Sequence, residues 1–170
     1  MERVALRAEV NKTSIYRRWP TREALVEAAL ARVHGAVARA AGGHGTLQAD
    51  LEALARSVAA LLSSPLGRAL TGSALAGGGA LAASSRKRLE QQASAELERL
   101  AGRARQRGEW AEHASPRPLL ALLVGAVMHR VLLERAPASG AWLRDAVSVL
   151  VRGVSPPSGR RSNARASSAR

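Results

Sequence analysis

The feature that most constrains the fold of this chain is the segment of residues 11–25, with the sequence NKTSIYRRWPTREAL. A proline disfavours helical geometry in the residue before it, so Trp19-Pro20 ends a short helix that begins after Asn11. Asn11 and Thr21 are good N-cap residues, because their side chains accept hydrogen bonds from the free amides of a first helical turn. The segment therefore predicts a short helix, a tight turn and the start of a longer helix.

The short helix is strongly basic and contains no acidic residue. Such side chains bind phosphates and base edges, and an arginine at the start of the next helix binds a phosphate together with the free backbone amides. This pattern is typical of the second helix of a helix-turn-helix, which lies in the major groove of DNA. The alternative is a solvated basic helix without a ligand. The candidate DNA-binding residues are Lys12, Thr13, Ser14, Tyr16, Arg17, Arg18 and Arg22.

The composition predicts an all-α chain with an aliphatic core. Ala, Leu and Arg are abundant, whereas Phe is absent and Tyr16 is the one tyrosine. Ala and Leu favour helices, and the β-branched and aromatic residues that favour strands are sparse. The formal net charge of +13 over 170 residues fits a polyanionic partner such as nucleic acid. A genome of high GC content also enriches Arg and Ala, so the charge is compatible with both explanations.

The sequence offers no pattern for catalysis, for a metal or for another cofactor. The absence of cysteine excludes disulfides, thiolate nucleophiles and cysteine-ligated zinc, and it fits a cytoplasmic protein. The histidines are scattered without metal-ligand spacing. None of the acids, Asp50 and Glu109 among them, has an evident acid/base partner. We therefore expect neither an enzyme nor a cofactor.

Helical spacing and caps predict about eight helices. In the first of them, Val4, Ala5, Leu6 and Ala8 are predicted to face inward. The charges of residues 1–10 differ from those of a signal peptide. The longest apolar run, residues 119–128, is shorter than the ~20 residues of a membrane span, so a buried core helix is expected. The predicted helices cover residues 1–10, 12–19, 21–41, 46–62, 66–76, 80–107, 116 or 118 to 133, and 139–152, with a break at 77–79.

A longer string of residues carries a resemblance to a known family. The pattern is Val-Ser-Lys-x-Thr-Leu-Tyr-x-x-Phe/Trp-x-Ser-Lys-Glu-x-Leu, with Asn11 in place of the common Ser and Arg22 in place of the common Lys. On this string the chain resembles the DNA-binding domain of tetracycline-repressor (TetR) family regulators. Residues 118–133 and 141–154 resemble the family's last two helices. The matching residues are Val10, Lys12, Ser14, Ile15, Tyr16, Trp19, Thr21, Arg22, Glu23 and Leu25.

The resemblance implies a helix-turn-helix DNA-binding domain with its connecting helix in residues 1–41 and a helical effector-binding and dimerisation domain in residues 46–154. The composition adds a basic tail in residues 155–170. The tail contains Pro, Ser, Gly and Arg and no acid, so we expect it to be disordered. The last two helices would pair in a homodimer that binds a palindromic operator with half-sites ~34–36 Å apart. A small-molecule effector would release this repressor from DNA.

The resemblance also assigns roles to single residues. Tyr16 and Arg22 would contact phosphates. The residues facing the DNA, some of them contacting bases, would be Lys12, Thr13, Ser14 and Arg17. Apart from the resemblance, the residues themselves offer as candidates for an effector pocket Met128 and His129 on the apolar helix, together with Trp110. For Trp110 and His129, a place in the core or in the subunit interface is the alternative.

Family members have a further helix before the position of Met1. We therefore expect this chain to begin inside the DNA-binding domain, either as a fragment with an upstream start or as a genuine truncation. Ile15 and Trp19, which are four residues apart and should point inward, would then lose part of their cover. The alternative function is a helical dimer that binds ligands or partner subunits without binding DNA.

Overall fold

The computed structural model of the protein describes residues 1–40, 42–75 and 80–156. Within these ranges the chain is helical and contains no strand, as the composition predicted. The predicted break at residues 77–79 and the tail beyond residue 156 lie outside the described residues. In chain order the elements are α1 (Glu2–Arg7), α2 (Lys12–Arg18), α3 (Arg22–Ala40), α4 (Leu47–Ser63), α5 (Pro65–Leu75), α6 (Ala80–Gln106), α7 (Pro116–Met128), the π-helix η1 (His129–Leu133) and α8 (Gly140–Val154).

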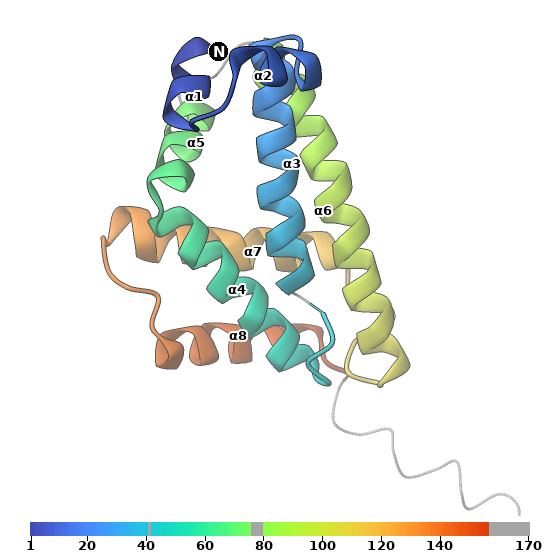
Figure 1. Cartoon of the computed structure of the whole chain (residues 1–170). Helices are drawn as coiled ribbons and strands as arrows, with labels where there is room; N and C mark the ends of the chain where they lie inside the picture. Colours follow the sequence, from blue (N-terminus) through green and yellow to red (C-terminus); the bar gives the residue numbers. More distant parts are fainter. Residues whose placement is uncertain (41, 76–79, 157–170) are drawn as a thin grey trace, which may run out of the picture.

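The helices place the N-terminal segment and the last helix at opposite ends of the molecule (Figure 1). We call residues 1–25, which form α1, α2 and the first turn of α3, the head. From the head, α3 runs beside α6 and packs against α4. The core lies where α4, α7, α8 and the end of α6 meet, and it is aliphatic as expected. Its most deeply buried apolar side chains are Leu47, Leu51, Leu100, Leu123, Val127, Leu143 and Val147.

The predicted caps are present. The Asn11 side chain accepts a hydrogen bond from the Thr13 amide at 2.8 Å, and the Thr21 hydroxyl accepts one from the Ala24 amide at 3.1 Å. Trp19 has an extended backbone (φ −135°) and ends α2 before Pro20. The chain direction therefore changes where the sequence predicted, and α2 is held between two capped turns.

The prediction for the inward face of α1 is wrong in part. Ala5 is buried, but Val4 and Ala8 are exposed and Leu6 is 81% exposed. The reason is geometric: α1 is six residues long and packs on α2, so a helix this short with a partner on one side buries a single position. Ala5 and Ile15 are the buried apolar side chains of the head among the described residues.

The turn between α1 and α2 places a non-glycine residue in the left-handed region. Glu9 has φ 53°, its amide donates to the Leu6 carbonyl at 3.3 Å, and the Val10 amide donates to the Ala5 carbonyl at 3.1 Å. This hydrogen-bond pattern closes a helix with a left-handed cap, a position at which glycine avoids the steric cost of a Cβ.

We expect Glu9→Gly to stabilise the protein by about 1 kcal/mol, because it removes this steric cost from the turn. Urea unfolding followed by circular dichroism measures the change. Glu23→Gly is the matched control: Glu23 is an exposed acid within α3, where glycine should destabilise by about 1 kcal/mol. Equal changes in both variants would contradict a special cost at Glu9.

The apolar helix predicted through Leu133 is not a single α-helix. α7 begins at Pro116 and ends at Met128, and the π-helix η1 continues it to Leu133. By length and composition alone, the stretch Pro116–Leu133 could cross a membrane. A single such helix is weak evidence of a membrane span, and 22% of this stretch is buried. Leu119, Leu123 and Val127 recur at helical spacing and pack into the core. α7 is thus a core helix with a second, exposed apolar face.

Candidate nucleic-acid interface

The orientation of α2 follows from its one buried side chain. Ile15 is 5% exposed and points into the head. Successive residues turn by about 100° around a helix, so Thr13 and Arg17 lie about 160° from Ile15 and form the outermost edge of α2. Ser14 and Tyr16 lie about 100° from Ile15, on either side. All four side chains are exposed, and together they define the outer face of α2.

Lys12 and Arg18 lie nearer the buried side, about 60° from Ile15. The Lys12 ammonium is 3.6 Å from the Glu2 carboxylate on α1, and both side chains are exposed. The Arg18 guanidinium lies over the Trp19 ring, 5.4 Å from its centroid. Lys12 and Arg18 therefore flank the outer face, and each has an intramolecular partner.

The seventh candidate, Arg22, is the first residue of α3 and is exposed. The Thr21 hydroxyl caps the Ala24 amide, and the Thr21 carbonyl accepts from the Leu25 amide at 3.3 Å. The amides of the first helical turn have no intrahelical acceptor, and they carry the positive end of the helix dipole. Arg22 thus adds a cation beside a helix N-terminus suited to a phosphate.

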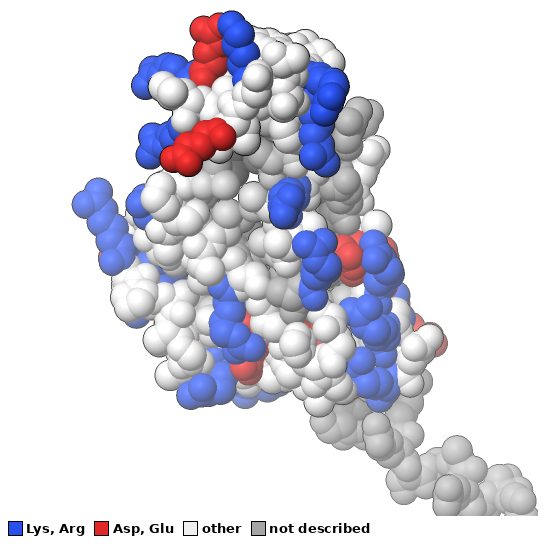
Figure 2. Space-filling view, in the orientation of Figure 1, with Lys and Arg blue, Asp and Glu red and all other residues white. Residues whose placement is uncertain are grey.

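Bulk charge does not single out this interface. On the face drawn in Figure 2, basic side chains are spread along the molecule, and acidic ones stand among them at the end formed by α1 and α2. What distinguishes the head is the arrangement of donors on one helix face, next to a capped helix start.

The three candidate effector residues are not brought together. Trp110 is buried in the core, and its indole N–H donates to the Ala114 carbonyl at 2.9 Å, just before α7 begins. Met128 is half-buried at the other end of α7, which is 13 residues and therefore about 20 Å long. His129 is exposed, with its Nδ1 3.1 Å from the Glu134 carboxylate. No small molecule of ordinary size would reach from Trp110 to His129.

The π-helix explains why His129 pairs with Glu134. Its wider turn brings residues five apart together, and the Glu134 amide donates to the His129 carbonyl at 3.0 Å. A hydrogen bond from Arg130 holds the pKa of Glu134 below its usual range, and the neighbouring His129 acts in the same direction. Arg130 also lies over the ring of Trp142 on α8, 5.7 Å from its centroid. This cluster fixes the junction between α7 and α8.

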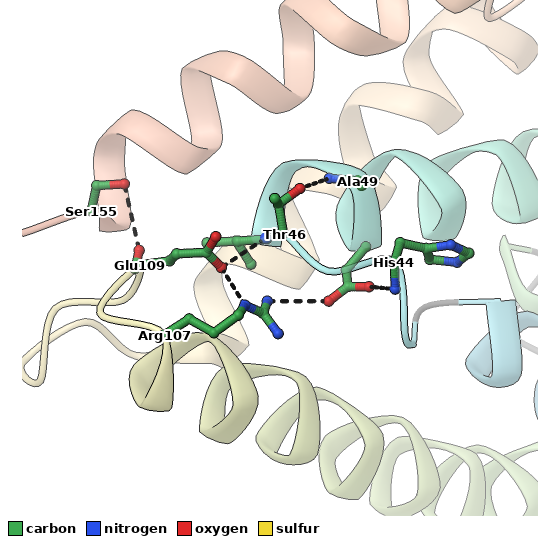
Figure 3. A network of polar contacts seen from close by, with 8 residues as sticks. His44, Thr46, Ala49, Arg107, Glu109 and Ser155 are labelled. Carbon is green, nitrogen blue, oxygen red and sulfur yellow. Dashed lines mark hydrogen bonds and ion pairs between the residues drawn. The ribbon is translucent and has the colours of Figure 1, made fainter.

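A second polar cluster was missed by the sequence analysis (Figure 3). Arg107 lies between two carboxylates: one terminal nitrogen is 3.4 Å from Asp50 Oδ2, and its Nε donates to Glu109 Oε2 at 2.8 Å. Asp50 is fully buried. The hydrogen bond to Glu109 is the main cause that raises the pKa of Arg107 above its ordinary value. We call Asp50, Arg107 and Glu109 the latch.

The sequence did contain a signal for the latch. Asp50 stands three residues after Leu47 and four before Leu54, on the apolar face of the predicted helix. A carboxylate on such a face needs a partner, because burying an unpaired charge is costly. The partner, 57 positions away, could not be identified without the fold. Among the described residues, no group of three His, Cys, Asp or Glu side chains could hold a metal ion.

Two family models match the chain, and together they cover most of it. Residues 41–150 match the model of the tetracyclin repressor-like C-terminal domain, and residues 1–29 match that of bacterial regulatory proteins of the tetR family. A comparison with curated proteins finds no match. The N-terminal match contains α1, α2 and the start of α3, and the C-terminal match contains the latch and most of the core.

Proposed function

The chain belongs to the TetR family of bacterial DNA-binding transcriptional regulators, and on that premise we propose that it is a homodimeric repressor released from its operator by a small molecule. The observation that carries the proposal is the outer face of α2, where four exposed donors stand opposite the buried Ile15. A helix with this face is suited to the major groove. The protein would act in the cytoplasm, on the chromosome.

In this proposal, the outer face of α2 meets base edges except at Tyr16, and Tyr16 and the flanks of α2 meet the backbone of the DNA. Thr13, Ser14 and Arg17 would face the bases. Tyr16 and Arg22 would contact phosphates, with the Arg22 guanidinium beside the free amides of α3. Lys12 and Arg18 lie on the flanks of α2, which supports phosphate contacts for them as well.

The exposed apolar side chains of the last helices support a dimer. Leu122 on α7, Leu133 in η1 and Val149 on α8 are 61%, 74% and 63% exposed. Exposed apolar patches usually mark interaction sites, and three exposed apolar side chains on consecutive elements support one here. In a two-fold dimer the same face occurs on both subunits, and a stable interface buries ~800 Å² on each. Two heads related by this axis would bind two half-sites of a palindrome.

Release by an effector requires that the small molecule bind the two states of the dimer with different affinity. Met128 and His129 are proposed as contacts at one end of α7, and Trp110 as a contact at the other. Their separation supports two alternative positions for the effector rather than one site that contains all three.

We expect Tyr16→Ala and Arg22→Ala each to weaken operator binding about tenfold. Arg22→Ala should also lower the dependence of affinity on salt by about one phosphate contact per half-site, whereas Tyr16→Ala, which removes no charge, should leave it unchanged. Gel-shift titrations at several fixed salt concentrations measure both quantities. Arg56→Ala, which removes an exposed cation from α4, is the matched control. If both head variants bind like Arg56→Ala, the proposed interface is wrong. If the unaltered protein dimerises but binds no DNA, the alternative function, a helical dimer without DNA binding, is favoured.

A further inference from the structure

Three segments of the chain meet at the latch. Asp50 lies in the first turn of α4, and Arg107 and Glu109 follow the end of α6 at Gln106. The Asp50 carboxylate also accepts the amide of His44, in the linker of residues 42–46 that joins α3 to α4, at 3.0 Å. Glu109 Oε2 accepts the amide of Leu47, the first residue of α4, at 2.9 Å. Both carboxylates therefore accept hydrogen bonds from backbone amides near the point where the linker joins α4.

The end of α6 is shaped so that both of its charged residues reach this point. Gly108 has φ 71°, its amide donates to the Arg105 carbonyl at 2.9 Å, and the Glu109 amide donates to the Ala104 carbonyl at 2.9 Å. This left-handed cap reverses the chain between Arg107 and Glu109. Both side chains consequently turn toward the start of α4, where Arg107 can bond to Asp50 and Glu109 at once (Figure 3).

The same point is tied to the last helix. The Ala111 amide donates to the carbonyl of Val154, the final residue of α8, at 2.8 Å. The Ser155 hydroxyl lies 3.5 Å from the Glu109 carbonyl. The linker is thus attached, through the latch, to the end of a helix that the proposed function places at the dimer interface.

Because α3 is long, its angle at the linker determines the position of the head. α3 is 19 residues and therefore about 28 Å long, with the linker at one end and Arg22 at the other. A tilt of about 10° at the linker would move the far end by about 5 Å for a helix of this length. This displacement exceeds the 3.4 Å rise between base pairs along one strand. A head must therefore be held at a nearly fixed angle if two heads are to match two half-sites.

We propose that Asp50, Arg107 and Glu109 are positioning residues for DNA binding: by fixing the linker to the ends of α6 and α8, they set the distance between the two heads of the dimer. The inference rests on the proposed function, since it concerns the geometry with which the same heads meet the operator. The three residues lie far from α2 and touch no DNA.

Three variants test the latch without leaving a buried carboxylate unpaired. Arg107→Lys keeps the cation, but a single ammonium cannot bond to both carboxylates in the way the guanidinium does. The double variant Asp50→Asn with Arg107→Gln removes both charges: Asn keeps the shape of Asp50, and Gln replaces the guanidinium with a shorter neutral amide. Glu109→Gln keeps an oxygen acceptor for the Leu47 amide. Glu98→Gln is the matched control, because it breaks the Arg105–Glu98 ion pair within α6, away from the linker.

Two measurements are made on the full chain, which must remain dimeric with an unchanged circular dichroism spectrum. In hydrogen exchange, we expect the amides of residues 42–49 to exchange about tenfold faster in Arg107→Lys and in the double variant, since hydrogen bonds to charged groups are lost. Against operators whose half-sites are moved apart or together by one or two base pairs, these variants should lose the preference for one spacing. If the competent head arrangement falls to about a tenth of the population, the apparent Kd for the best operator rises about tenfold.

Glu109→Gln should show a smaller change of the same kind, and Glu98→Gln none. Unchanged exchange and an unchanged spacing preference in Arg107→Lys and in the double variant would overturn the proposal. A general loss of stability would lower affinity for every spacing alike, so a retained spacing preference with uniformly weaker binding also counts against it. If the unaltered protein binds no DNA, the proposed function fails, and the exchange of residues 42–49 still decides whether the latch fixes the linker.

Discussion

Arg17→Ala is expected to weaken operator binding by about 1–3 kcal/mol per half-site, because a guanidinium on the outer edge of α2 can form a bidentate pair with a base. Arg17 lies about 160° from the buried Ile15, so its side chain has the longest reach away from the head. The loss should be largest at one base position in each half-site, and substitutions at that position should no longer matter to the variant. Fluorescence anisotropy with operator and single-substitution duplexes measures it.

The neighbouring arginine provides the control for this prediction. Arg18→Ala removes the same charge one residue away, but Arg18 lies beside the buried side of α2 and over the Trp19 ring. Its loss should be smaller and should be the same for all sequences, as for a phosphate contact. Equal losses for the two variants, on operator and on unrelated DNA, would show that only the net charge of α2 matters and would refute the proposed orientation.

Leu122→Glu and Val149→Glu are expected to convert the proposed dimer into monomers. In a two-fold interface each substitution places a carboxylate from both subunits into apolar surface, and an uncompensated buried charge costs about 3–5 kcal/mol. The dimer dissociation constant should therefore rise more than about 100-fold. Operator affinity should fall by a factor of about 10²–10⁴, because binding of the second head is no longer intramolecular.

Analytical ultracentrifugation at micromolar concentration measures the oligomeric state. Leu66→Glu is the matched control, since Leu66 is an exposed leucine on α5, outside α7 and α8. A Leu66→Glu protein that stays dimeric beside monomeric Leu122→Glu would support the interface. Dimers that survive both α7 and α8 substitutions would contradict it.

Local sequence rules predicted the elements that depend on local interactions. The caps at Asn11 and Thr21 were predicted, because each lies next to the amides that it accepts from. The inward direction of Ile15 was also predicted, from its spacing to Trp19. The orientation of α2, and with it the difference between Arg17 and Arg18, follows from that one side chain.

Features that depend on distant packing could not be predicted in the same way. Leu6 satisfies the pattern of an inward residue, but its exposure depends on how few elements pack against α1. The Asp50–Arg107 pair joins residues 57 positions apart and has no local signature for its partner. The change from α-helix to π-helix at His129 has no signature in the sequence, because the apolar run continues into residues 131–133.

Selection of duplexes from a random DNA library, with the unaltered protein and with Arg17→Ala in parallel, shows how the head recognises DNA. We expect a two-fold symmetric motif whose half-site centres are about one helical turn apart, 10–10.5 base pairs. We also expect Arg17→Ala to select the same spacing with one base position relaxed in each half. A selected pool without a symmetric motif, or an identical motif for both proteins, would contradict the claim that the outer face of α2 recognises DNA as part of a dimer.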